Sequence, residues 1–214
     1  MRAMSTFISF LLIIVSISSC QDDINIDTSN SDTNNSDSVF TSKVKRTSMF
    51  NGAFDDVLDN SPCFAIQYPI TVRLNTIAVN FNSAADLNLI APTDIIEISF
   101  PIVITSYDYT ETTITNQQEF DTIISACEEL VSNQGGPINC INFNYPLNIF
   151  TVTNGQTQNI FEIESNEELY FFIDNLDNNT FYSFRFPLQI TEPNSGNISV
   201  ENNTALDTYL GICL

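Results

Sequence analysis

An aromatic–proline pair recurs four times along the chain, each time inside a stretch where apolar and polar residues alternate strictly. The pairs are Tyr68-Pro69, Phe100-Pro101, Tyr145-Pro146 and Phe186-Pro187. This alternation, in β-branched and aromatic residues, predicts a half-buried β-strand in each copy. Because proline has no backbone N–H to donate, each strand must be an edge or be bulged at its proline. The internal repeat therefore constrains the fold more than any other feature.

Each aromatic–proline strand is followed by a shorter second strand and then by a helix start. The second strands contain Val79/Phe81, Thr112/Ile114, Phe161/Ile163 and Ile198/Val200, and the candidate N-cap residues are Ser83, Asn116, Ser165 and Asn202. Three positions after the first three caps stand the acids Asp86, Glu119 and Glu168, the pattern of a capping box or its Asp variant. The sequence predicts an α+β fold with four strand-strand-helix units, comprising eight strands in largely antiparallel sheet and four short helices.

The cysteine positions indicate that the four units form a duplicated pair. Cys63 and Cys140 each lie six residues before the proline of units one and three. Cys127 and Cys213 each lie seven residues after the first apolar helix residue of units two and four. We therefore expect a first half at residues 48–136 and a second half at residues 137–214. The turn at residues 134–137 (Gln-Gly-Gly-Pro) is the expected hinge between them.

These four cysteines form an even set, which is typical of proteins that fold in an oxidising compartment. Of the three possible pairings, the duplication favours Cys63–Cys127 and Cys140–Cys213, one bridge in each half. The alternative of a tetrathiolate zinc site is disfavoured because no two of these cysteines are closely spaced. A reactive thiol is disfavoured because no base or cation is evident nearby.

The first twenty residues have the layout of a secretion signal, with Arg2, an apolar run at residues 7–17 and small residues before Cys20. The end of the run, Ile-Ser-Ser-Cys, resembles a bacterial lipobox, in which the cysteine is lipidated and becomes the first residue of the mature protein. An ordinary signal peptide is the alternative. Residues 21–47 are mostly Asp, Asn, Ser and Thr and are predicted to be a flexible polar tether.

The charge balance excludes several classes of function. The chain has 26 acidic and 6 basic residues, a formal net charge of -20, and only Arg73 and Arg185 are basic after Arg46. Nucleic-acid binding needs clustered cations, so we expect no nucleic-acid partner. The chain has no histidine, which excludes Ser-His-Asp and Cys-His catalysis and His-ligated metals. Arg73 and Arg185 are each expected to pair with a neighbouring acid, with an anion clamp between them as the alternative.

Acidic residues offer two further candidate chemistries. Residues 55–59 and 174–179 carry the oxygen ligands that Ca²⁺ prefers. Neither stretch has the spacing of a known calcium loop, and the second is expected to be a turn between a helix and a strand. A carboxylate pair could hydrolyse glycosidic bonds without histidine, but the acids are scattered over loops, helix starts and outward strand positions. We therefore assign no catalytic residue, no metal site and no cofactor.

Aromatic residues outside the alternating phase of the strands are candidates for a binding surface. Tyr107, Tyr109 and Phe150 lie near predicted hairpin tips. Residues 170–172 (Tyr-Phe-Phe) follow one another on a predicted helix and cannot all face one side of it. An exposed patch there would indicate a partner-binding surface, but packing of both helix faces between the halves is favoured.

Several features occur together between Cys20 and Cys213: the lipobox, the acidic Gln-Asp-Asp that follows it, the polar tether, a cysteine before an aromatic–proline strand and Asn/Ser-x-x-Glu-Leu helix starts. In this combination the chain resembles a group of uncharacterised cell-surface lipoproteins of marine flavobacteria and other Bacteroidota. The resemblance implies a lipid anchor on Cys20 and delivery to the outer membrane, facing the medium, with the periplasmic face as the alternative. It implies no activity.

We therefore expect a non-enzymatic binding or structural module with a protein or glycan partner. The alternatives are a carboxylate-dependent hydrolase of surface glycans and a calcium-stabilised adhesin subunit.

Overall fold

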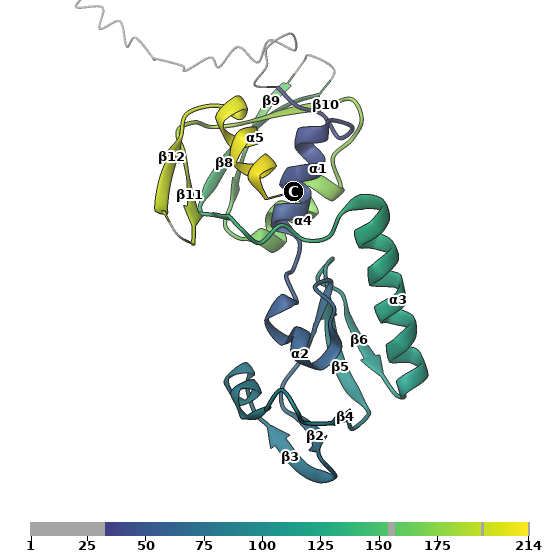
Figure 1. Cartoon of the computed structure of the whole chain (residues 1–214). Coiled ribbons are helices and arrows are strands. Elements are labelled where there is room, and N and C mark those ends of the chain that lie inside the picture. Colours follow the sequence, from purple (N-terminus) through teal and green to yellow (C-terminus); the bar gives the residue numbers. More distant parts are fainter. Residues whose placement is uncertain (1–32, 154–156, 194, 214) are drawn as a thin grey trace, which may run out of the picture.

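The computed structural model describes residues 33–153, 157–193 and 195–213, so Cys20 and residues 21–32 of the expected tether lie outside the described residues. The described chain is an α+β protein whose strands form four three-stranded antiparallel sheets. Figure 1 shows two of these sheets in each half, with helices beside them. None of the described helices is long and apolar enough to cross a membrane.

Each unit runs from strands to a helix as predicted, but it contains three strands rather than two. The first half contains η1 (Ala53–Asp55), α2 (Asp56–Asp59), β1 (Phe64–Ile66), β2 (Ile70–Leu74), β3 (Ile77–Phe81), η2 (Ala84–Leu89), β4 (Ile96–Ile98), β5 (Ile102–Ser106), β6 (Glu111–Ile114) and α3 (Gln117–Gln134). The second half contains β7 (Asn142–Phe143), β8 (Leu147–Thr153), β9 (Thr157–Ile163), α4 (Asn166–Asp174), β10 (Thr180–Phe184), β11 (Leu188–Glu192), β12 (Gly196–Val200) and α5 (Asn203–Ile212). One more helix, α1 (Val39–Ser48), precedes both halves in sequence.

The prediction of eight strands is wrong: the described residues form twelve, because each aromatic–proline pair interrupts its long strand. In the first half, β1 pairs with β5, whereas β2 pairs with β3 and β4. In the second half, β7 pairs with β11, and β10 pairs with β8. The proline cannot donate to the ladder, so the strand leaves one sheet there and enters another. The two units of each half thus exchange strand segments.

Reciprocal backbone hydrogen bonds mark this exchange in both halves. In each unit, the N–H two residues before the proline donates to the carbonyl two residues after the other unit's proline. The four bonds are Gln67 to Val103 (2.8 Å), Ser99 to Thr71 (2.9 Å), Asn144 to Gln189 (3.0 Å) and Arg185 to Asn148 (2.8 Å). The peptide bond before each of the four prolines is cis. Each half is therefore a pseudo-twofold pair of units.

The helix starts predicted from the caps are confirmed. The Asn116 and Ser165 side chains accept hydrogen bonds from the backbone N–H groups three residues later, at 3.0 and 3.1 Å. Asn202 does the same at 2.9 Å. In unit one, Ser83 and Asp86 form a capping box, but the helix that follows, η2, is a six-residue 3₁₀ helix.

The prediction that residues 21–47 form a flexible tether is wrong for its last part. Asn34 pairs with Tyr182 through two backbone hydrogen bonds, and α1 begins at Val39. Phe40 and Val44, four residues apart on one face of α1, are buried in the core of the second half. Figure 1 shows α1 in this half, beside α4 and α5. The segment is ordered because its short apolar stripe completes a core formed much later in the chain.

The basic residues of α1 contact the second half and the hinge between the halves. Lys43 pairs with Asp207 of α5 at 2.7 Å. Lys45 pairs with Asp174 of α4, and its ammonium lies 5.1 Å from the centre of the Tyr170 ring. The Arg46 guanidinium donates to the carbonyl of Gly136 in the hinge at 2.8 Å.

Candidate functional site

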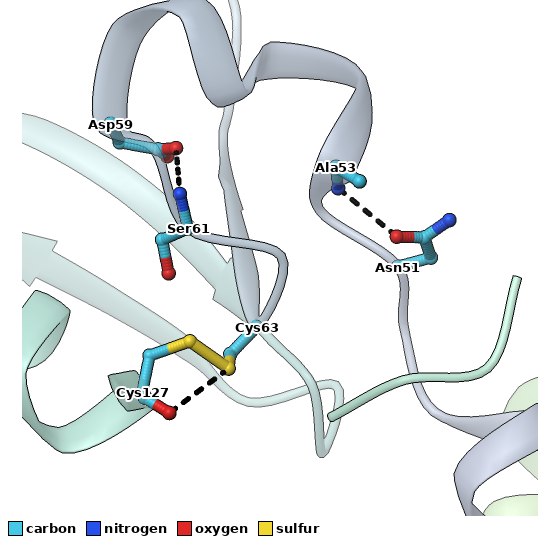
Figure 2. Close-up of a disulfide and its surroundings, with 6 residues drawn as sticks. All are labelled: Asn51, Ala53, Asp59, Ser61, Cys63 and Cys127. Atoms are coloured by element: carbon cyan, nitrogen blue, oxygen red, sulfur yellow. Dashed lines mark hydrogen bonds between the residues drawn. A yellow bond between two sulfur atoms is a disulfide. The ribbon is translucent and has the colours of Figure 1, made fainter. Parts of the chain in front are cut away.

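Both predicted disulfides are present. Cys63–Cys127 joins the start of β1 to α3, and Cys140–Cys213 joins the segment before β7 to the end of α5. Figure 2 shows the first bridge below the turn formed by Asp59 and Ser61. Because these four cysteines are paired with one another, they form neither a thiolate zinc site nor a reactive thiol.

An open hollow of about 530 Å³ lies where the two aromatic–proline pairs of the second half meet. Its aromatic and proline lining comes from Tyr145-Pro146 and Phe186-Pro187. Its polar lining comes from the positions two residues before and after each proline: Asn144, Asn148, Arg185 and Gln189. These are the four residues whose backbones form the reciprocal hydrogen bonds. The pseudo-twofold exchange therefore places three amides and one guanidinium around a single hollow.

The first half has an equivalent hollow of about 520 Å³ that contains no charged group. It is lined by Pro69, Thr71, Ser99 and Pro101, with Asn80 and Asn82 of the neighbouring β3 segment. Ser99 occupies the position in unit two that Arg185 occupies in unit four, two residues before the proline. The two hollows thus differ in charge at equivalent positions.

The expectation that Arg73 and Arg185 each pair with an acid is wrong for the described residues. The only ion pairs there involve Lys43 and Lys45. Both arginines are exposed. Arg73 lies on β2 of the first half and lines neither hollow, so the two arginines do not share either of these sites. Among the residues that the structure describes, Arg185 therefore has no acidic partner, and it lies beside a hollow in a chain of net charge -20.

Two of the three aromatic residues proposed as exposed tips, Tyr109 and Phe150, are used in packing instead, whereas Tyr107 is half-buried and lines a groove beside the Cys63–Cys127 bridge. Phe150 is buried. The Tyr109 ring lies 5.9 Å from that of Tyr170 and 6.2 Å from that of Phe171, both on α4. The Tyr109 hydroxyl donates to the carbonyl of Ser48 at 2.7 Å, and its burial raises the pKa of this phenol above the usual value. These contacts support the interpretation that α4 packs between the halves, although Phe171 stays 41% exposed.

The burial of two carboxyl groups, those of Asp55 and Asp59, was not predicted from the sequence. Asp55 is fully buried, and its Oδ2 accepts from the N–H of Ile66 at 2.7 Å. Asp59 is 5% exposed, and its Oδ1 accepts from the N–H of Ser61 at 2.9 Å, as Figure 2 shows. The second oxygen of each carboxyl group has no hydrogen-bond partner. Burial is the main cause that raises the pKa of Asp55 to about 6 and that of Asp59 to about 8, and the nearby Asp55 charge contributes to the second of these shifts.

The positions of these carboxyl groups fit neither the glycosidase chemistry nor the calcium site considered from the sequence. Neither Asp55 nor Asp59 lines either of the hollows at the aromatic–proline pairs. Within the described ranges, no group of three or more Cys, Asp or Glu residues is arranged to hold a metal ion. The other candidate calcium stretch, residues 174–179, is the turn expected from sequence: Asp177 accepts from the N–H of Asn179 at 2.7 Å, and Asp174 pairs with Lys45.

The buried carboxyl groups predict an unusual pH dependence of stability. Because the pKa of Asp59 is higher in the folded chain than the unfolded value, the native state holds more protons between about pH 4 and 8. The contribution of Asp59 to the free energy of unfolding is therefore largest below its unfolded pKa. This contribution is lost as the pH rises through 8. We expect Asp59→Asn to raise the free energy of unfolding at pH 9 by a few kcal/mol, at about 1.4 kcal/mol per pKa unit.

Urea denaturation of the wild type and Asp59→Asn at pH 5, 7 and 9 checks this prediction. Asp177→Asn is the matched control, because Asp177 is exposed and accepts an equivalent backbone hydrogen bond two residues ahead. We expect the control to keep the wild-type loss of stability between pH 5 and pH 9. An Asp59→Asn protein with the wild-type pH profile would show that Asp59 is charged in the folded state.

A further groove, of about 440 Å³, was not anticipated from the sequence. It lies beside the Cys63–Cys127 bridge and is lined by residues of α3, such as Ile123 and Leu130, and by Phe64 and Tyr107. It arises from the contact of a long helix with a short sheet, which local patterns do not predict.

Comparison of the chain with protein-family models, with curated proteins and with solved structures finds no match.

Proposed function

We propose that the chain is a lipid-anchored module of the outer membrane, displayed at the cell surface, that binds a glycan or protein partner and catalyses no reaction. The lipobox ending at Cys20 supports the anchor, since acyl chains contribute about 0.8 kcal/mol of membrane affinity per buried CH₂ group. The hollow between the two aromatic–proline pairs of the second half carries the binding part of the proposal.

The chemistry of this hollow suits recognition. Three side-chain amides supply both donors and acceptors, and one guanidinium supplies a planar set of donors. Tyr145 and Phe186 add apolar surface beside them, as in many ligand sites that combine apolar area with a few convergent polar groups. The hydroxyl of Tyr145 is already engaged with Asn166 at 2.6 Å, which holds this ring in place.

The buried position of Asp55 and Asp59 favours a binding module over a hydrolase. A glycosidase uses a pair of carboxyl groups, one protonated with a raised pKa as the general acid and one ionised as the base or nucleophile. Such a pair must touch the glycosidic oxygen and the anomeric carbon. Asp55 and Asp59 are nearly or fully covered and lie outside both aromatic–proline hollows.

Replacement of Cys20 tests the anchor. We expect the wild-type chain to begin at an acylated Cys20 and to partition into detergent, whereas Cys20→Ala remains unacylated and loses detergent partitioning. Intact mass, detergent phase separation and protease shaving of whole cells measure the acylation, the anchoring and the exposed face. A wild-type chain without acyl mass would contradict the anchor, and one protected in intact cells would place it on the periplasmic face.

Binding without turnover is tested with the full chain in detergent on a panel of insoluble polysaccharides and cell-envelope proteins. We expect retention on at least one of them and no release of reducing ends from any glycan. Release of reducing ends that Asp55→Asn abolishes would favour the hydrolase instead.

A further inference from the structure

Arg185 is the one charged residue among those described that lines the second-half hollow, and the proposed function does not yet give it a role. In the described part of the chain, three of the five basic residues, Lys43, Lys45 and Arg46, hold α1 through ion pairs or the hinge carbonyl. Arg73 lies outside the hollows on a strand. Only Arg185 lines a hollow, and no acid of the described residues neutralises it. A guanidinium in this position is available to a ligand.

The residues around Arg185 indicate the kind of ligand. A guanidinium binds a carboxylate through two parallel N–H···O bonds. Asn148 and Gln189 are the neighbouring polar residues of the hollow, and amides can both donate to and accept from hydroxyl groups. A hollow of about 530 Å³ is in the size range of small-molecule sites and small for a protein interface. The combination fits a sugar that carries one carboxylate.

The charge of the whole chain limits the ligand further. A net charge of -20 repels a densely charged polyanion that approaches the surface of the chain. One exposed arginine offsets this repulsion only locally, since exposed charges are screened within about 8–10 Å at physiological salt. A mainly neutral glycan with an isolated acidic sugar meets the arginine without bringing further negative charge.

We propose that the second-half hollow binds an acidic sugar of a mainly neutral glycan, with Arg185 holding its carboxylate and Asn148 and Gln189 contacting its hydroxyl groups. This inference rests on the proposed function, of which it specifies the ligand class. The equivalent hollow of the first half has Ser99 in place of the arginine and takes no carboxylate.

Calorimetric titration of the full mature chain in detergent tests this proposal. The probes are sialyllactose and a glucuronic-acid-terminated disaccharide, and lactose is the neutral control. We expect the wild type to bind at least one acidic probe at least tenfold more tightly than lactose, and to bind it more weakly as salt is raised.

Arg185→Gln and Arg73→Gln form a matched pair, because each removes one exposed arginine from a different half. We expect Arg185→Gln to weaken binding of the acidic probe by about ten- to a hundredfold, the range for a charge-assisted hydrogen bond. Arg73→Gln should stay within twofold of the wild type. Circular dichroism spectra of both variants should match that of the wild type, because neither side chain is buried.

The failures of this inference and of the proposed function are distinguishable. Equal binding of lactose and the acidic probes, or an Arg185→Gln protein that binds as the wild type does, overturns the carboxylate assignment and leaves glycan binding standing. Binding of none of the soluble sugars also overturns the assignment, and the panel of insoluble polysaccharides and envelope proteins then decides the proposed function separately.

Discussion

Gly52→Ala is expected to prevent the first half from folding. Gly52 is buried, and its N–H donates to the carbonyl of Pro62 at 3.0 Å. A methyl group on Gly52 would lie 1.8 Å from the carbonyl oxygen of Phe64 and 2.9 Å from its nitrogen. The obstacle is backbone, not a flexible side chain. It belongs to a buried strand, β1, that pairs with β5 and begins next to the disulfide at Cys63.

The size of this effect follows from the stability of small domains. Relief of the collision requires β1 to shift within a close-packed core, and overpacking of this severity costs more than the usual 1–3 kcal/mol. Domains of this size are stable by about 5–15 kcal/mol in total. We therefore expect loss of the cooperative unfolding transition of the first half, or no soluble protein at all.

Gly211→Ala is the matched control. Gly211 is exposed on α5, and a methyl group there would meet only the ammonium of Lys43, at an ordinary 3.9 Å. Alanine is a better helix former than glycine by about 1 kcal/mol, so this variant should be as stable as the wild type or slightly more stable. Urea denaturation of both variants checks the prediction. A Gly52→Ala protein of wild-type stability would contradict the packing of residues 50–52 against β1.

Loss of either disulfide is expected to have the second largest effect. The bridges span 64 and 73 residues. Closing loops of this length removes enough entropy from the unfolded chain to stabilise the folded state by about 4 kcal/mol per bridge in the chain-entropy model. Each half has its own hydrophobic core, so we expect each paired Cys→Ser variant to destabilise mainly the half that loses its bridge.

Thermal unfolding of Cys63→Ser/Cys127→Ser and Cys140→Ser/Cys213→Ser measures these effects. Each variant serves as the control for the other, and the variant with all four replacements should lose about the sum, because distant sites usually add. A lowered unfolding temperature for only one of the two variants would contradict the equivalence of the two halves. Peptide mapping without reduction should recover both linked pairs from the wild type.

Much of the local structure was predictable because neighbouring residues determine it. The period-two stretches form strands, Ser165 and Asn116 cap helices, and the positions of the cysteines within the repeat identify both disulfides. Each of these features depends on a few adjacent residues or on a comparison between copies of one unit.

The remaining features depend on contacts between distant parts of the chain. The proline positions indicated an interruption, but not that β1 would pair with β5 of the next unit. Phe40 and Val44 form a short apolar stripe within a polar segment. From the sequence alone, this stripe does not predict that α1 packs onto α4 and α5. The burial of Asp55 and Asp59 depends on the packing of other segments over them, and no local sequence pattern predicts it.

The hollow of the second half was only partly predictable from the sequence. The residues two positions from each proline, such as Arg185 and Asn148, lie between the apolar residues of the alternating stretches. Their convergence required knowledge that the two units of a half exchange strands. Arg185 was interpreted as one half of an ordinary ion pair, because its distance from every acid cannot be read from sequence.

Nuclear magnetic resonance of the full mature chain in detergent micelles, titrated with the tighter acidic probe, tests the central claim most directly. That claim is that the chain binds its ligand in the second-half hollow. We predict shifts concentrated at the side-chain N–H signals of Asn148, Arg185 and Gln189. Shifts at Thr71, Asn80 and Ser99 of the first-half hollow instead, or no localised shifts, would contradict it.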